Sequence, residues 1–233
     1  MGSNNKLISR SAKFTAMQLT VWLLALYAAL LGGLHGYFLM QQGIVTDTVF
    51  VSAIGDPCQP ALNAHACWPA MTIFPDLTLS GIVTICIAVV FAFWVIWGTR
   101  HTSYGFTIFL LSIVLLLTGG GFLPPLYGCM AAFLMSRSPN AWVRQIRFVP
   151  QRISNLLGNL WATLLAVYFL WVGVQLVFYD VLNDILLEIG NFVLIAEICL
   201  LLLACFAAIN RDKDALFRST ANTIYHKGGR KVA

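Results

Sequence analysis

The chain has 233 residues, of which 59% are hydrophobic and only 10% are charged, and its formal net charge is +5. Soluble domains carry about 25% charged residues, so this composition excludes an ordinary water-soluble domain. The positive charge does not indicate a nucleic-acid-binding protein, because the sequence has no zinc-finger spacing and no recognition helix with a basic face.

The apolar residues form uninterrupted runs close to the ~20 residues that a helix needs to cross the hydrocarbon layer of a membrane. We therefore expect residues 1–233 to form a single membrane domain with an all-α fold, a polytopic transmembrane helix bundle surrounded by the lipid bilayer. The first apolar run covers residues 16–40 and follows a polar, basic head. A signal peptide begins in the same way, but no small-x-small cleavage pattern follows Gly36, so a membrane anchor is the favoured interpretation.

Residues 41–76 contain no Lys or Arg and are rich in Gly, Pro, Asp, Asn and Thr. Four prolines forbid a long helix there, whereas the β-branched residues within 46–52 favour a short strand. We expect this segment to form a small, irregular extracytoplasmic cap loop. The second membrane segment follows over residues 77–98, with Trp94 and Trp97 near its end, where tryptophan favours the headgroup level.

Residues 104–135 are apolar, and as one helix these 32 residues would be ~48 Å long, against ~30 Å of hydrocarbon. Gly119, Gly120 and Gly121, followed by Pro124 and Pro125, interrupt the run. Glycines permit unusual dihedral angles and prolines suit the first turn of a new helix. The pattern predicts a third segment over 104–118 and a fourth over 122–135 that form a tight hairpin, the fourth being either short or re-entrant.

Residues 136–152 carry four arginines and two aromatic residues, a composition that suits a segment lying on an anionic membrane surface. The fifth segment is expected over 153–179 and the sixth over 185–210, joined by an acidic turn over 180–184. A basic tail occupies 211–233. With six segments, all 14 Lys and Arg residues fall on one face of the membrane. The positive-inside rule assigns that face, with the N- and C-termini, to the cytoplasm of a plasma (inner) membrane.

Two cysteines, Cys58 and Cys67, lie in the predicted outer loop, where an oxidising compartment favours a structural disulfide. A thiol-oxidoreductase interpretation requires a reactive pair such as Cys-x-x-Cys, and the sequence has none. The other four cysteines lie in apolar helices and are expected to pack as small hydrophobic residues.

The carboxyl group of Glu197 is predicted near the middle of the sixth segment, where an unpaired carboxylate is costly. Protonation or hydrogen bonds from polar residues of neighbouring helices must compensate that cost. The candidate donors are Tyr27, Ser112, Thr163 and Tyr168. The sequence leaves two roles open for Glu197, a proton or cation relay and a neutral acid that joins two helices.

Three more acidic residues, Asp180, Asp184 and Glu188, recur at a spacing of four and share one face if the last helix begins near Asp180. This acidic stripe is a candidate for cation attraction, or a solvated helix end. Glu197 is nine residues beyond Glu188 and therefore lies half a turn away from it around the helix. The acidic stripe and the buried Glu197 therefore do not form one continuous path for an ion along this helix.

The four histidines do not fall at matching depths or at ligand spacing, so we predict no metal site and identify no cofactor. They are His35, His65, His101 and His226. The sequence also has no phosphate-binding loop, no Gly-x-Ser-x-Gly and no His-Glu-x-x-His, and therefore no predicted catalytic residue.

Three classes of function remain open from the sequence. The favoured one is a non-catalytic subunit or accessory protein of a membrane complex, with a protein partner or a second copy of the chain bound to it. The alternative is a small proton- or cation-coupled transporter or channel subunit that uses Glu197. The third is a membrane enzyme that acts on lipid or quinone. A count of membrane segments does not separate the three.

Overall fold

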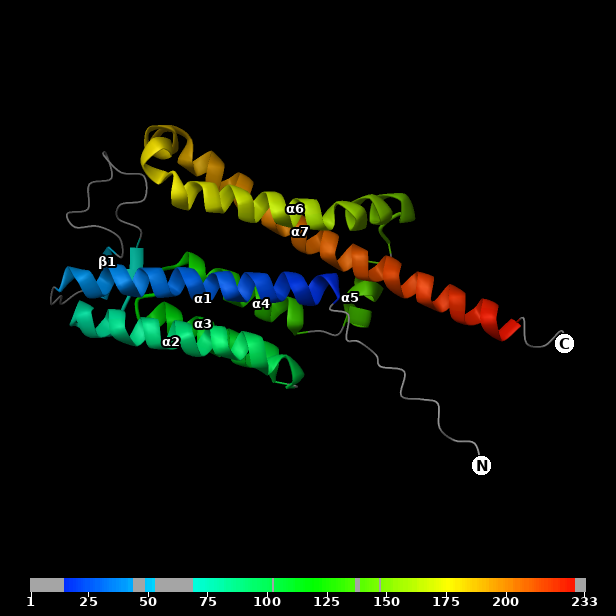
Figure 1. The fold of residues 1–233 in the computed structure, drawn as a ribbon, viewed down its shortest axis with the longest axis horizontal. Coiled ribbons are helices and arrows are strands. Elements are labelled where there is room, and N and C mark those ends of the chain that lie inside the picture. The colour runs from blue at the N-terminus through cyan, green and yellow to red at the C-terminus, as the bar shows by residue number, and fades with distance from the viewer. Residues whose placement is uncertain are drawn as a thin grey trace, which may run out of the picture.

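The computed structural model describes residues 15–43, 49–52, 69–101, 103–136, 139–146 and 148–228. These residues form α1 (Ala16–Gln42), α2 (Leu77–Trp97), α3 (Tyr104–Leu117), α4 (Leu123–Met135), α5 (Pro139–Gln145), α6 (Gln151–Val177) and α7 (Tyr179–Gly228) (Figure 1). A 3-10 turn, Gly98–Arg100, follows α2. Two short strands, β1 (Phe50–Ser52) and β2 (Pro69–Met71), pair antiparallel at one end of the bundle. We call this end the strand end and the opposite end the α5 end.

Four helical segments are long and apolar enough to cross a membrane: α1, α2, α6 and the Phe192–Lys213 part of α7. The apolar helices α3 and α4 are shorter, with 14 and 13 residues. The described part of the chain is therefore an almost entirely helical fold with four candidate spans, as expected for an integral membrane protein.

Local signals in the sequence set the ends of the first two long helices. Thr15 caps α1, because its hydroxyl accepts a hydrogen bond from the Gln18 N–H (3.2 Å) while the Gln18 side chain accepts one from the Thr15 N–H (3.1 Å). Gly43 ends α1 with a φ of 62°, a conformation that glycine adopts without strain. At α2, the Asp76 carboxylate accepts hydrogen bonds from the N–H groups of Thr78 and Leu79.

Helices α3 and α4 lie antiparallel and in contact. A Cβ atom on Gly105, near the start of α3, would lie 3.2 Å from the Cβ of Met135 at the end of α4. The chain reverses through Gly119 and Gly121, whose φ angles are 108° and 76°. Side chains of L-residues rarely tolerate such angles, so the glycines are needed for the reversal.

The reversal between α3 and α4 is held by α2 and by the strand segment. The Thr118 carbonyl accepts hydrogen bonds from the hydroxyl groups of Ser80 (2.6 Å) and Thr84, both on α2. The Thr72 hydroxyl is 2.7 Å from that of Ser80, and the Ile73 N–H donates to the Leu117 carbonyl (3.0 Å). The last carbonyl groups of α3 are thus satisfied although they lie inside an apolar bundle.

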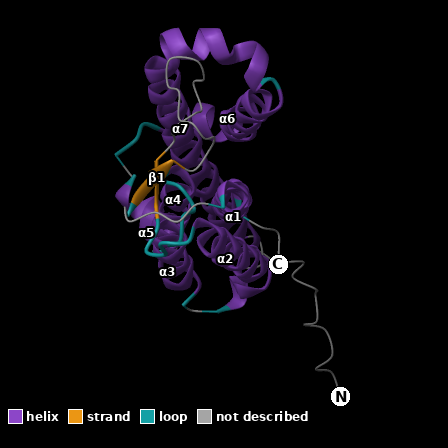
Figure 2. Ribbon diagram, turned by 90° about the vertical axis from the view of Figure 1, so that its left-hand side faces the viewer, coloured by secondary structure: helices purple, strands orange, loops and turns teal. Residues whose placement is uncertain are grey.

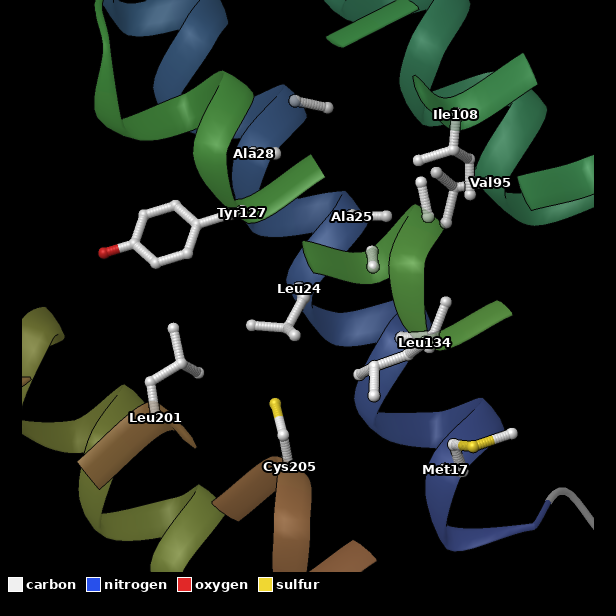
Figure 3. Packing of buried hydrophobic residues seen from close by; sticks show 14 of the residues in the cluster. Met17, Leu24, Ala25, Ala28, Val95, Ile108, Tyr127, Leu134, Leu201 and Cys205 are labelled. Atoms are coloured by element: carbon white, nitrogen blue, oxygen red, sulfur yellow. The ribbon is translucent and has the colours of Figure 1, made fainter. Parts of the chain in front are cut away.

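Helices α1 and α2 pack backbone to backbone through two glycines. A Cβ atom on Gly81 would lie 2.4 Å from the Gly36 carbonyl oxygen, and one on Gly36 would lie 2.9 Å from the Gly81 carbonyl oxygen. Small residues permit such close approach between membrane helices. The buried cluster continues from α1 to α4 and α7, where Leu24 faces Leu201 and Cys205 (Figure 3).

Helices α6 and α7 form a pair on one side of the α1–α4 group (Figures 1 and 2). The α6–α7 pair is hydrogen-bonded to α1 at the α5 end. The Asp212 carboxylate accepts hydrogen bonds from the N–H groups of Ala16 (2.8 Å) and Met17 (3.1 Å), so α7 caps the first turn of α1. The Lys213 Nζ donates to the Val149 carbonyl (3.2 Å).

The predicted turn over residues 180–184 is wrong, because α7 is helical from Tyr179. Helix α6 ends at Val177 and Phe178 joins it to α7, since the Phe178 carbonyl accepts hydrogen bonds from the N–H groups of Val181 (3.1 Å) and Leu182 (3.0 Å). Acidic residues favour the positive end of the helix dipole, so they mark a helix start here rather than a loop. The helix does not stop at residue 210 either and continues through the predicted tail to Gly228.

The Gly36–Gly81 contact predicts a selective loss of stability. We expect Gly81→Ala to lower the stability of the purified protein by about 1–3 kcal/mol, because the new methyl group forces α1 and α2 apart. Gly33→Ala is the matched control, since its Cβ would meet its nearest atom, the Ala88 Cβ, at 3.7 Å. Thermal unfolding in the same detergent compares them, and equal midpoints would contradict the prediction.

Candidate functional site

Glu197 lies on the side of α7 that faces α6 and is partly buried. Its Oε1 accepts a hydrogen bond from the Trp171 Nε1 (2.9 Å) and another from the Gln175 side-chain amide. Trp171 and Gln175 are four residues apart and therefore share one face of α6. One carboxylate oxygen thus joins the two helices through two donors.

The donors that the structure gives Glu197 are Trp171 and Gln175, not the candidates Ser112, Thr163 or Tyr168. Ser112 donates to the Ile108 carbonyl of its own helix (2.7 Å), Thr163 is exposed, and Tyr168 donates elsewhere. The sequence signal that was missed is the pair of polar groups, Trp171 and Gln175, at helical spacing in the last turns of an apolar helix.

Three tyrosines from three helices meet within the bundle: Tyr27 of α1, Tyr127 of α4 and Tyr168 of α6. We call them the tyrosine cluster. The Tyr168 hydroxyl donates to the Tyr127 hydroxyl (2.8 Å), and the Tyr27 ring lies edge-on to the Tyr127 ring, with centroids 5.2 Å apart. Figure 3 shows Tyr127 extending from α4 beside Leu201 of α7.

The acidic stripe is not brought to Glu197. Asp184 and Glu188 are exposed on α7, whereas Glu197 faces α6, so the half-turn difference in phase persists in the structure. Asp180 lies in the first turn of α7, and its side chain is outside the described residues. The three acids of the stripe therefore do not enlarge the candidate site.

The predicted disulfide between Cys58 and Cys67 lies outside the described residues. The other four cysteines, Cys86, Cys129, Cys199 and Cys205, are free thiols.

No group of three or more His, Cys, Asp or Glu side chains able to hold a metal ion occurs among the described residues. His35 is buried, and its Nδ1 lies 2.9 Å from the Leu31 carbonyl oxygen. Its ring packs on Gly121, where a Cβ atom would come within 2.6 Å of it. His101 stacks on the Trp94 ring, with centroids 5.4 Å apart. Both rings therefore serve as packing groups at opposite ends of the bundle.

Comparison with protein-family models, curated proteins and solved structures finds no match for this chain.

The Glu197–Gln175 hydrogen bond predicts coupling between the two side chains. In a double-mutant cycle with Glu197→Leu and Gln175→Leu, we expect a coupling energy of about 0.5–1.5 kcal/mol, the range of interhelical hydrogen bonds in membranes. Denaturant unfolding in mixed micelles measures it. Pairing Gln175→Leu with Glu188→Gln provides the control, because Glu188 is exposed, and that cycle should give additive losses. Additive losses of stability in both cycles would contradict the predicted coupling.

Proposed function

We propose that this protein is a non-catalytic subunit or accessory protein of a membrane complex, and that it binds another membrane protein through the strand-end half of the α6–α7 pair. The observation that carries the proposal is the contrast between glycines on this pair and glycines in the rest of the bundle. A Cβ atom on Gly173 of α6 or on Gly190 of α7 would meet no atom within 4 Å.

Three helical glycines of α1, α2 and α4 instead mark close contacts. Cβ atoms on Gly36, Gly81 and Gly128 would each come within 3 Å of another helix. Membrane helices use small residues to bring backbones together, because lipid offers no hydrophobic driving force between helices. Gly173 and Gly190 are the small residues that such a contact needs, but no helix of this chain packs against them. A helix of a partner protein would complete the contact.

The strand-end half of the pair also exposes large apolar side chains. Leu170 of α6 is 70% exposed and Phe192 of α7 is 76% exposed. The contacts of α7 with α1 lie toward the α5 end, through Leu201, Cys205 and Asp212. The strand-end half of α7 is therefore left with much of its circumference available to lipid or to a second protein.

The proposed membrane arrangement has six segments, with the antiparallel α3 and α4 as a hairpin whose turn lies at the strand end. Exposed arginines at the α5 end, Arg144, Arg152 and Arg211, support a cytoplasmic location for that end under the positive-inside rule. Both chain ends are then cytoplasmic, and the strand end faces the other side of a cell membrane.

Photo-crosslinking in native membranes tests the partner surface. We expect a photoreactive amino acid at position 190 to give a crosslinked product of one defined mass, and a probe at Phe93 of α2, which is 58% exposed, to crosslink only lipid. A product of two copies of the chain would identify the partner as the protein itself. Lipid adducts alone at both positions, with a monomer after gentle solubilisation, would overturn the proposal.

The open space at Gly190 allows a matched substitution. A Cβ atom at position 190 would meet no atom within 4 Å, so we expect Gly190→Leu to leave the unfolding midpoint unchanged but to cause loss of the complex, seen as a shift to lower mass on native electrophoresis. Phe93→Leu serves as the control that retains the complex. An intact complex with leucine at position 190 would place the partner surface elsewhere.

A further inference from the structure

The α5-end half of α6 exposes polar side chains on one face of an otherwise apolar helix. Arg152, Asn159 and Thr163 are all exposed, and they share this face because they are seven and four residues apart. Helix α6 is a candidate membrane span, and charged side chains near the end of such a helix reach the level of the lipid headgroups. This face of α6 is therefore positioned to contact headgroups.

A second arginine joins this face from α7. The Arg211 Nη1 donates a hydrogen bond to the Asn159 Oδ1 (3.3 Å), so α6 and α7 present these two side chains together. Arg211 is exposed and lies near the end of the candidate span Phe192–Lys213. Arg152 precedes Asn159 by about two helical turns, ~10 Å along the axis, a separation comparable with the Debye length of ~10 Å at 0.1 M salt. Two positive charges are thus gathered here, and we call Arg152, Asn159 and Arg211 the arginine site.

The polar atoms left open at the arginine site are hydrogen-bond donors. Since the Asn159 oxygen accepts from Arg211, the Asn159 side-chain nitrogen carries the remaining N–H groups, and these have no acceptor in the described part of the chain. Among the described residues, Arg152 has no hydrogen-bond or ion-pair partner, and Arg211 has Asn159 alone. Donors and positive charge without acceptors require a ligand with acceptor oxygens and negative charge.

The phosphate group of a membrane lipid meets these requirements. A phosphodiester has acceptor oxygens and a negative charge, and arginine binds phosphate oxygens through two parallel N–H donors. Exposed apolar side chains, Leu160 and Val167, follow along α6 toward the strand end. They are seven residues apart and share one side of the helix. A lipid held by its headgroup can lay its acyl chains on them, whereas a soluble phosphate has no group that would bind there.

From these contacts we propose that the arginine site binds a lipid with an anionic phosphate headgroup, between α6 and α7 at the α5 end. Basic pockets between membrane helices bind such headgroups in other proteins. The site selects anionic over zwitterionic lipid, because a zwitterionic headgroup also carries a positive charge, which the two arginines repel. This inference goes beyond the proposed function and does not depend on it, since the partner surface lies on the strand-end half of the pair.

Native mass spectrometry of the full chain in mild detergent tests the site. Phosphatidylglycerol and phosphatidylcholine with the same acyl chains are titrated in turn, and the affinity for the first bound lipid is measured. We expect phosphatidylglycerol to bind at least about fivefold more tightly than phosphatidylcholine. Arg211→Gln should lower the affinity for phosphatidylglycerol about fivefold, the effect of one basic residue near an anionic headgroup, and Arg152→Gln should lower it in the same direction.

Two further variants make the outcome specific. Arg144→Gln is the matched control, because Arg144 is an exposed arginine of α5 at the same end but outside the site, and the affinity should not change. Asn159→Asp still accepts from Arg211 but sets a negative charge against the phosphate, so it should keep its unfolding midpoint and lose the preference for phosphatidylglycerol. Equal affinities for the two lipids, equal losses with Arg144→Gln and Arg211→Gln, an unchanged preference with Asn159→Asp, or displacement of phosphatidylglycerol by soluble glycerol 3-phosphate would each overturn the proposal.

Discussion

Every backbone carbonyl group in hydrocarbon needs a partner inside the protein, and this constraint governs how the bundle is built. The end of α3 is the place where it acts most visibly. Helix α3 ends just before Thr118, so the Thr118 carbonyl has no helical N–H partner. The hydroxyl groups of Ser80 and Thr84 on α2 donate hydrogen bonds to this carbonyl instead. Because α2 supplies these donors, the reversal between α3 and α4 is fixed to α2, and α1 packs on the same helix through Gly36 and Gly81.

The sequence predicted those features that depend on residues close together in the chain. The membrane-type composition, the long apolar helices and the helix break between residues 117 and 123 all follow from local patterns, because Gly and Pro act on their own backbone. The same reasoning misread residues 180–184, since acidic residues occur both in loops and at helix starts. The break between α6 and α7 instead falls at Phe178, an apolar residue that gives no turn signal.

The candidate site was predicted only in part, for a physical reason. An acidic residue within an apolar run is recognisable in the sequence, so Glu197 could be predicted as a candidate. Its partners could not, because they depend on how α6 is rotated against α7, and that rotation is set by packing between residues far apart in the chain. Tyr168 was a candidate donor to Glu197, but its hydroxyl donates to the Tyr127 hydroxyl, whereas Trp171 and Gln175 donate to the acid.

The bond from Asp212 to the first turn of α1 has a consequence for how the protein is made. The two N–H groups that it satisfies belong to α1, and Asp212 follows them in the chain by 196 and 195 positions. Asp212 is therefore synthesised after α1, and this contact forms only once that part of α7 has been made. A chain truncated before Asp212 lacks the bond that joins α7 to the first turn of α1.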